Sequence, residues 1–270
     1  MNRRNFSQMI AAAVLAPAFR NAVAQPTLSA QFRFSVMLWT IDGKLPFERC
    51  VEIASSAGYK GVELVHEFDR WSPEETRRMV AKMHSLGLMV DAIAGVNAEF
   101  SDPQGGGHLL AQLTRQIAIA KSLECPAIIL LSGKRKSGLP RPAQYQASIE
   151  NLKRAGDLAT HHNIQLLIEP IDPIEDPTIY LTSVGEGFEI VRAVGNPAVT
   201  ILYDFYHEQR ATGNLIEKLE KNIDWVGLVH IADVPGRREP GTGEIDYRNI
   251  YRKLAQLNYN KFVAMEYQPT

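Results

Sequence analysis

Residues 164–204 read IQLLIEPIDPIEDPTIYLTSVGEGFEIVRAVGNPAVTILYD. Two short aliphatic runs, Gln165–Ile168 and Thr200–Tyr203, lie on either side of a helical pattern. The helical pattern opens with the capping-box spacing of Ser183–Glu186 and ends at Gly195, a typical C-cap residue. A strand, a helix and a second strand in this order predict two parallel strands joined by a crossover helix.

The same alternation continues in both directions along the chain. Six further aliphatic runs bring the number of candidate strands to eight: Phe34–Leu38, Gly61–Val65, Met89–Ile93, Ala127–Leu131, Gly227–Val229 and Val263–Met265. Six further helical patterns lie between the runs: Phe47–Ala57, 73–86, Leu109–Leu123, Ala143–His162, Leu215–Asn222 and Tyr247–Leu257. Ser72-Pro73-Glu74-Glu75 is a capping box with proline at the first helical position, and Gly87 follows the last turn.

Eight strands alternating with helices predict a single (β/α)8 TIM barrel over residues 31–270. Only seven helices are readable, and the sequence offers no room for an eighth helix after the last strand. We therefore expect residues 25–31 or a second copy of the chain to cover the junction between strands eight and one. A homo-oligomer is one of the arrangements that this gap suggests.

The net charge of the chain indicates whether nucleic acid is an expected partner. The chain has 270 residues, of which 45% are hydrophobic and 22% charged, and its formal net charge is −1. The first 25 residues carry three arginines and no acid, so the remainder has a charge of −1 − 3 = −4. A mildly acidic chain lacks the basic face with which proteins bind nucleic acid, so we expect no nucleic-acid partner.

The N-terminus has the features of a signal peptide over residues 1–24. Arg3-Arg4 precedes an apolar run from Met9 to Phe19, and Ala22-Val23-Ala24 resembles a cleavage site. Paired arginines before such a run are typical of twin-arginine signals. The run is too short to span a membrane, and Pro17 interrupts it. We therefore expect an exported or periplasmic protein without a membrane anchor.

Four consecutive strands end in side chains that can bind a metal. These residues are Glu169, Asp204, His230 and Glu266, one on each of strands five to eight. The active site of a TIM barrel lies at the C-terminal ends of its strands, and neighbouring strands are about 4.8 Å apart. Four inward groups at one level can therefore converge on a single ion. The sequence predicts a metal site made of these four residues.

Three carboxylates and one imidazole form an oxygen-rich set of ligands. Such a set favours one divalent ion, Mn²⁺, Mg²⁺ or Co²⁺ rather than Zn²⁺. Four protein ligands would leave two positions for the carbonyl and hydroxyl oxygens of a substrate, and the ion would stabilise an enediolate. Glu169 and Glu266, on strands five and eight, would then flank the ion as an acid/base pair.

The loops after the strands add candidates for substrate binding. Residues 206–210, YHEQR, are expected to form a loop that contains His207. The glycine-rich loop after strand seven carries Arg237, and Lys134 follows strand four at the same rim. Either cation could hold a substrate carboxylate, which arginine can bind with two parallel hydrogen bonds. Glu63, near the end of strand two, is open to two interpretations: a group beside the metal or substrate, or a buried partner of a cation.

Five stretches of the sequence carry a family resemblance. The stretches are Leu166–Ile171 (LLIEPI), Tyr203–Arg210 (YDFYHEQR), His230–Asp233 (HIAD), Glu239–Tyr247 (EPGTGEIDY) and Glu266–Pro269 (EYQP). In these residues, and in their order and spacing, the chain resembles the hydroxypyruvate isomerase family of the xylose isomerase-like barrels. The resemblance covers most of residues 31–269.

The resemblance implies an intramolecular isomerase that interconverts hydroxypyruvate and tartronate semialdehyde. It implies that Glu169 and Glu266 transfer the proton and bind the metal, with Asp204 and His230 completing the ligand set. It also implies that His207 and Arg237 contact the substrate. The ligand would be a small carbohydrate or hydroxy-carbonyl acid.

Three other functions remain open at this stage. Histidine at position 230 is the pattern of the wider sugar epimerase group, so a periplasmic ketose 3-epimerase or a 3-keto-sugar lyase or epimerase is the main alternative. Only the isomerase of an acid requires Arg237 or Lys134 to pair with a carboxylate. An endonuclease-like phosphoesterase would need more histidine ligands and a basic face. A non-catalytic binding protein would not need Glu169 and Glu266.

Overall fold

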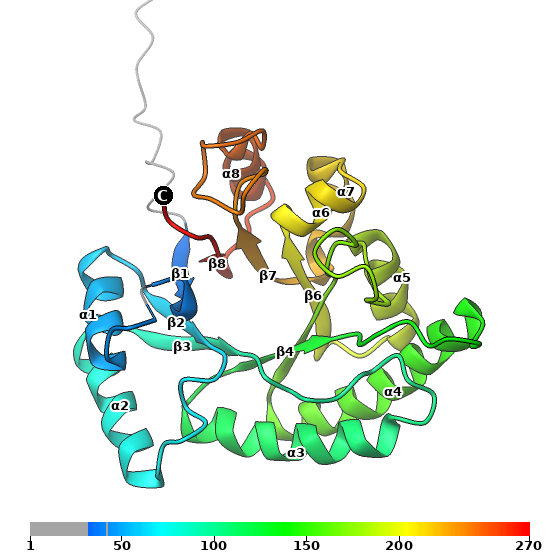
Figure 1. Ribbon diagram of the computed structural model, residues 1–270, viewed down its shortest axis with the longest axis horizontal. Helices are drawn as coiled ribbons and strands as arrows, with labels where there is room; N and C mark the ends of the chain where they lie inside the picture. The colour runs from blue at the N-terminus through cyan, green and yellow to red at the C-terminus, as the bar shows by residue number, and fades with distance from the viewer. Residues whose placement is uncertain (1–31, 42) are drawn as a thin grey trace, which may run out of the picture.

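The chain folds into a closed barrel of eight parallel strands, as the sequence predicts. The structure, a computed structural model, describes residues 32–41 and 43–270. The strands pair in chain order, and β8 pairs with β1 (Figure 1). The strands are β1 (Arg33–Met37), β2 (Gly61–Leu64), β3 (Met89–Ile93), β4 (Ala127–Leu131), β5 (Gln165–Glu169), β6 (Val199–Asp204), β7 (Val226–Ile231) and β8 (Phe262–Met265). The predicted signal peptide, residues 1–24, lies outside the described residues.

The described residues contain eight α-helices, which surround the strands in chain order (Figure 1). The helices are α1 (Phe47–Ser56), α2 (Pro73–Ser85), α3 (Gly106–Ser122), α4 (Arg141–His162), α5 (Val184–Val194), α6 (Phe205–Ala211), α7 (Leu215–Asn222) and α8 (Tyr247–Gln256). The prediction of seven helices was wrong because the segment expected as a loop after β6 is the helix α6. Residues 266–270, after β8, contain no helix. Among the described helices, none is both long and apolar enough to cross a membrane.

Local hydrogen bonds explain where two of the helices begin. The predicted capping box of α2 is present: the Ser72 hydroxyl accepts from the Glu75 N–H, and the Glu75 carboxylate accepts from the Ser72 N–H. At α5 the Ser183 hydroxyl accepts from the Gly185 N–H instead. The predicted reciprocal box is not formed there, because the Glu186 carboxylate binds Arg141.

Replacing Ser72 with alanine is expected to destabilise the protein by about 1 kcal/mol, because the first turn of α2 loses its capping acceptor. Urea denaturation measures this difference in the free energy of unfolding. Ser85→Ala, at the other end of α2, is the control and should change stability by less than about 0.5 kcal/mol. Equal effects of the two substitutions would contradict the capping role.

Two layers of apolar side chains hold the barrel. One group fills the interior and comprises Met37, Ala92, Ala127, Ile129, Leu167, Leu202, Leu228, Phe262 and Ala264, with the larger group packed between strands and helices. Gly227 of β7 leaves room for this interior, because a Cβ at that position would lie 2.4 Å from Leu167 Cδ2. Tight interior packing fixes the strand positions, and thus the residues at the strand ends.

An aromatic cluster covers part of the junction between β8 and β1. The ring of Tyr251, on α8, lies 5.8 Å from the ring of Phe32 and 6.1 Å from that of Phe34. Phe34 belongs to β1, so α8 reaches across β8 to its neighbour. The residues that we expected to cover this junction, 25–31, lie outside the part of the chain that the structure describes.

Candidate active site

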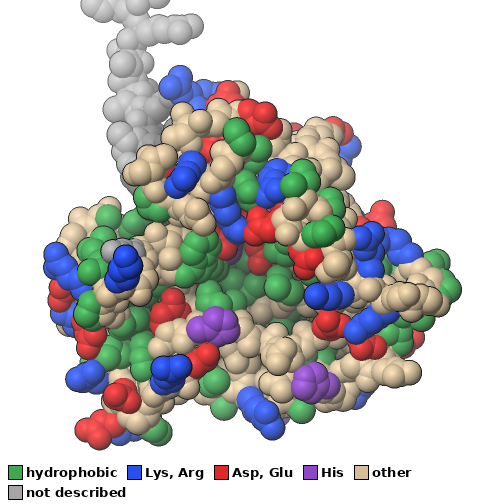
Figure 2. Space-filling view, viewed as in Figure 1, with side chains coloured by type: hydrophobic (Ala, Val, Ile, Leu, Met, Phe, Trp, Pro, Cys, Tyr) green, Lys and Arg blue, Asp and Glu red, His purple; other side chains and the backbone are tan. Residues whose placement is uncertain are grey.

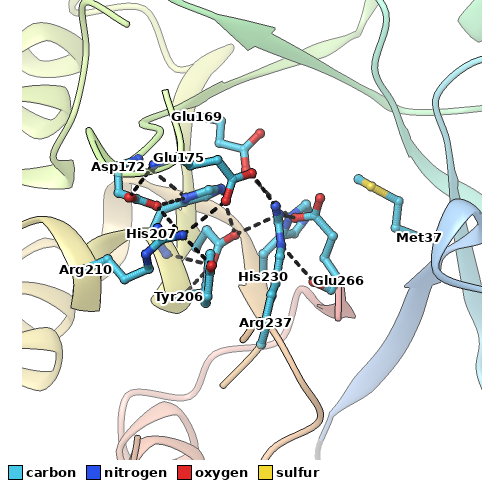
Figure 3. Close-up of polar contacts among 12 residues, drawn as sticks. Met37, Glu169, Asp172, Glu175, Tyr206, His207, Arg210, His230, Arg237 and Glu266 are labelled. Atoms are coloured by element: carbon cyan, nitrogen blue, oxygen red, sulfur yellow. Dashed lines mark hydrogen bonds and ion pairs between the residues drawn. The ribbon is translucent and has the colours of Figure 1, made fainter. Parts of the chain in front are cut away.

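The four predicted ligands come together at the C-terminal ends of β5 to β8. One carboxylate oxygen from each of Glu169, Asp204 and Glu266 and one nitrogen of His230 all lie within 4.8 Å of one another. All four residues are buried. Figure 3 shows Glu169, His230 and Glu266 around a shared space. Parallel strands in a closed barrel thus bring together residues that are far apart in the sequence.

Asp204 serves both the fold and the site. Its Oδ1 accepts hydrogen bonds from the N–H groups of Tyr206 and His207, at 2.7 and 3.4 Å, and so caps α6. Its Oδ2 is buried and has no hydrogen-bond partner. The nearest cationic groups, on His207 and Arg237, are 3.6 and 3.8 Å away. A buried carboxylate oxygen without a partner is costly, so this atom is suited to bind a cation.

His230 is held between acidic side chains. Its Nδ1 lies 2.8 Å from Glu266 Oε2 and 3.8 Å from Glu169 Oε1, so this nitrogen faces the candidate ligands. Its Nε2 lies 2.9 Å from Oε2 of Glu63, which is fully buried on β2. Of the two interpretations of Glu63, the structure favours a group beside the candidate metal site. A carboxylate on one ring nitrogen orients a histidine and leaves the other nitrogen available to a metal.

The two glutamates have opposite acidities. Burial and the negative charge of Glu266 raise the pKa of Glu169 to about 7. Burial also acts to raise the pKa of Glu266, but the hydrogen bond from His230 and the charge of Arg237 outweigh burial and lower this pKa to about 2. Near neutral pH, and before any cation binds, Glu266 is therefore ionised and Glu169 is partly protonated. Two carboxyl groups with separated pKa values are typical of an acid and a base in one site.

The residues present fit a divalent cation. The three carboxylates and one imidazole place several negative charges within a buried space of a few ångströms. The unpartnered Oδ2 of Asp204 and the Nδ1 of His230 both face this space. Oxygen-rich sets of this kind suit Mn²⁺, Mg²⁺ or Co²⁺.

A second group of polar residues borders the ligand set. His207 Nδ1 lies 2.7 Å from Asp172 Oδ2, and Arg210 lies 3.2 Å from both Asp172 and Glu175. Burial disfavours the charged imidazolium of His207, but the carboxylates of Asp204 and Asp172 outweigh burial and raise its pKa to about 9. His207 therefore holds a proton at the edge of the candidate site.

Arg237 joins the two groups. Its Nη2 lies 2.8 Å from Glu266 Oε2, and its Nη1 lies 2.7 Å from Glu175 Oε1. The guanidinium also lies over the rings of Trp39 and Tyr206, at 5.8 and 5.2 Å from their centroids. The backbone of Arg237 has φ +54°, a conformation that non-glycine residues seldom adopt outside functional sites and tight turns. The loop after β7 thus directs this cation into the site.

The structure does not bring Lys134 to the same place. Lys134 is exposed, and its backbone forms a β-bridge with Ile179 of the loop after β5. Arg238 also points elsewhere, because its guanidinium donates to the backbone carbonyls of Gln268 and Pro269. Of the three predicted substrate-binding residues, the structure places only His207 and Arg237 beside the ligand set.

Sequence reasoning missed Asp172 and Glu175. Both follow β5, in a loop that carries three acids within residues 172–176. Acids that follow directly after a ligand-bearing strand would have been a usable signal, because loops at the C-terminal face of a barrel border the active site.

A cavity of about 310 Å³ opens onto Glu169 and Glu266. Figure 2 shows this molecule hollowed at the centre of one face, where hydrophobic side chains gather beside acidic and basic ones. A larger cavity, of about 480 Å³, lies between Trp71 and Ile119. None of the candidate ligands lines that larger cavity, so the space beside the two glutamates is the candidate substrate site.

Replacing Glu63 with glutamine is expected to weaken divalent metal binding by about 10–100-fold, because His230 loses the carboxylate that orients its ring. Titration with Mn²⁺, followed by electron paramagnetic resonance, measures this affinity. Asp91→Asn is the matched control, since Asp91 is also a buried acid of the barrel but bonds Ser35 rather than His230. Unchanged affinity in Glu63→Gln would refute the positioning role.

Several known proteins are similar to this chain over most of its length. Hydroxypyruvate isomerase of Escherichia coli is 31% identical to this chain, over 88% of the chain and 93% of the relative. The 2-oxo-tetronate isomerase of Pectobacterium atrosepticum is 28% identical, over 88% and 92%. These relatives confirm the prediction of an isomerase. Among solved structures, an AP endonuclease, family 2, from Brucella melitensis matches with a TM-score of 0.81 at 26% identity, over 88% and 93% of the two chains.

A family model provides the broadest comparison. The model described as xylose isomerase-like TIM barrel matches residues 51–270, which include all four candidate ligands. The observed barrel of eight parallel strands is the architecture that this description names. The chain therefore belongs to the xylose isomerase-like TIM barrel family.

Proposed function

We propose that this chain is a metal-dependent isomerase that converts 3-hydroxy-2-oxo acids into 2-hydroxy-3-oxo acids. Hydroxypyruvate and tartronate semialdehyde are the smallest such pair. The relatives named hydroxypyruvate isomerase and 2-oxo-tetronate isomerase support this class of substrate. The observation that carries the proposal is the pair of buried glutamates, Glu169 and Glu266, on either side of one candidate metal position.

The reaction moves one proton between neighbouring carbons. A bound divalent ion would supply positive charge beside the carbonyl and hydroxyl oxygens of the substrate. Glu266, ionised at neutral pH, accepts the proton from the carbon that bears the hydroxyl group. Glu169, on the other side of the candidate metal position, gives a proton to the former carbonyl carbon, and proton exchange with solvent then returns both glutamates to their starting state.

His207 and Arg237 would take part in the remaining steps, which are proton exchange at the substrate oxygens and binding of the substrate carboxylate. The hydroxyl proton must pass from one substrate oxygen to the other, and His207 holds an exchangeable proton beside Asp204. The substrate carboxylate would pair with Arg237 where Glu175 now lies, 2.7 Å from its Nη1. Arginine suits this role because its planar guanidinium matches a carboxylate.

The test is turnover in D₂O by protein loaded with Mn²⁺, followed by proton NMR. With hydroxypyruvate or 2-oxo-tetronate, we expect the carbonyl group to move to the neighbouring carbon. A ketose 3-epimerase would return the proton to the same carbon, so the position of the carbonyl separates the two reactions. Absence of both conversion and deuterium exchange with Mn²⁺, Mg²⁺ and Co²⁺ would refute the proposal.

A further inference from the structure

The cavity beside Glu169 and Glu266 has one wall that is almost entirely apolar. Its side chains come from the ends of β1 to β4 and are Met37, Val65, Ala94, Val96, Ile129 and Leu131. We call these six residues the apolar wall. In Figure 3, Met37 lies on the side of Glu266 that faces away from Glu169. Apart from Glu63 on β2, the acids and cations of the site come from β5 to β8 and the loops that follow them, so the cavity has a polar and an apolar half.

The apolar wall reaches the reacting groups directly. Leu131 is the register partner of Glu169 across the β4–β5 pairing, so the two side chains emerge next to each other. Leu131 is nevertheless 43% exposed. Trp39, which lines the same cavity, is 38% exposed. Large apolar side chains left open to solvent beside a polar cluster are typical of a ligand-binding site.

The wall offers few hydrogen-bond partners to a ligand. Among the residues that the structure describes, His66 is the only titratable side chain that lines the cavity besides the two glutamates, and its Nδ1 lies 3.1 Å from Asp69. A hydroxylated chain placed against this wall would exchange hydrogen bonds with water for apolar contacts, which is unfavourable. An alkyl or aromatic group would instead gain from leaving water.

The cavity is also large for a three-carbon acid. Its volume of about 310 Å³ lies near the lower end of the roughly 300–1,000 Å³ of pockets that hold drug-sized ligands. Gly95 helps to keep the space open, because a Cβ there would lie 2.9 Å from the carbonyl oxygen of Val65 and would displace that residue of the wall. Space therefore remains beyond the two reacting carbons and the carboxylate.

We propose that the preferred substrate is a 3-hydroxy-2-oxo acid that carries a branched alkyl or aromatic group on the hydroxyl-bearing carbon. This inference rests on the proposed function and specifies its substrate. The carboxylate lies toward Arg237, the reacting carbons lie between Glu169 and Glu266, and the substituent packs on the apolar wall. One C–H bond breaks and one forms on the neighbouring carbon, while one O–H proton changes oxygen. No oxidant or reductant takes part, and the substituent does not react.

The experiment compares three acids on the Mn²⁺-loaded protein: hydroxypyruvate, 2-oxo-tetronate and 3-hydroxy-4-methyl-2-oxopentanoate. We expect kcat/KM for the isopropyl-bearing acid to exceed that for 2-oxo-tetronate at least about tenfold, since single methylenes in a hydrophobic pocket already change kcat/KM by such factors. Equal or greater kcat/KM for 2-oxo-tetronate would overturn the inference and leave the proposed function in place. No turnover of any of the three acids would overturn the proposed function itself.

Substitutions in the apolar wall test whether the substituent of the substrate binds there. Leu131→Asn should lower kcat/KM for the isopropyl-bearing acid about tenfold or more relative to kcat/KM for hydroxypyruvate. Val96→Thr, which is nearly isosteric, should act in the same direction and guards against a folding defect. Ile174→Asn is the matched control, because Ile174 is 69% exposed at the same end of the barrel and does not line the cavity. An equal loss for all three acids in Leu131→Asn would overturn the placement of the substituent.

Discussion

Glutamine at position 266 is expected to lower kcat by about 10²–10⁴-fold, the usual contribution of a positioned acid or base. The amide keeps the size of the side chain and one oxygen that can bind a metal, but it cannot accept the proton from the substrate carbon. Glu169→Gln should cause a loss in the same range, because the amide cannot donate the proton to the second carbon. Steady-state rates and the metal content of each variant are measured on the same preparations.

The metal content of each variant shows whether activity is lost through loss of the metal or through loss of proton transfer. If the loss were caused by an empty metal position, excess Mn²⁺ would restore the rate. We expect the loss to persist at saturating Mn²⁺. Glu244→Gln is the matched control, since Glu244 is exposed in the loop after β7 and bonds Gln209. Wild-type rates in both Glu169→Gln and Glu266→Gln, with metal bound, would rule out the proposed proton transfer.

Divalent metal affinity is expected to fall steeply as the pH falls from 8 to 6. Burial disfavours the charged form of His230, but Glu63 and Glu266 outweigh burial and raise its pKa well above the usual value. Glu169 has a pKa of about 7. Protonation of either residue weakens its bond to a metal, so protons compete with the ion. Up to two released protons correspond to a change in affinity of up to about 100-fold per pH unit.

Calorimetric titration with Mn²⁺ in two buffers of different ionisation enthalpy counts the released protons. In the variant His230→Gln the imidazole proton is absent, so the number of released protons should fall by about one. The part of the pH dependence of metal affinity that arises from Glu169 should remain. Equal affinities at pH 6 and pH 8, without proton release, would show that the metal-free site does not hold these protons.

Several positions could be predicted from the sequence because their residues stand at the end of a strand or at the start of a helix. Glu169, Asp204, His230 and Glu266 could be predicted together because each ends an aliphatic run, and a barrel brings the ends of parallel strands to one level. The start of α2 was predictable for a similar reason, since Ser72 and Glu75 form their capping box within a single turn. Such features depend on local spacing and on one rule of topology.

Features that depend on long-range contacts or on short elements could not be predicted in the same way. Glu63 and His230 are 167 residues apart, and no pattern in the sequence indicates that their side chains meet. The helix α6 has only seven residues, too few for a helical period to be recognised. Its start is fixed by Asp204, whose side chain was assigned to the metal alone.

The separation of the cavity into two halves has a consequence for how such an enzyme can change. The glutamates proposed to transfer the proton belong to β5 and β8, whereas the apolar wall belongs to β1 to β4 and the loops that follow them. A substitution such as Leu131→Asn therefore alters the surface that the substrate meets without replacing any residue proposed as acid, base or metal ligand. Natural divergence or laboratory evolution could explore new substrates through codons at the ends of β1 to β4 while the reaction itself is retained. A focused mutant library needs to randomise only that half.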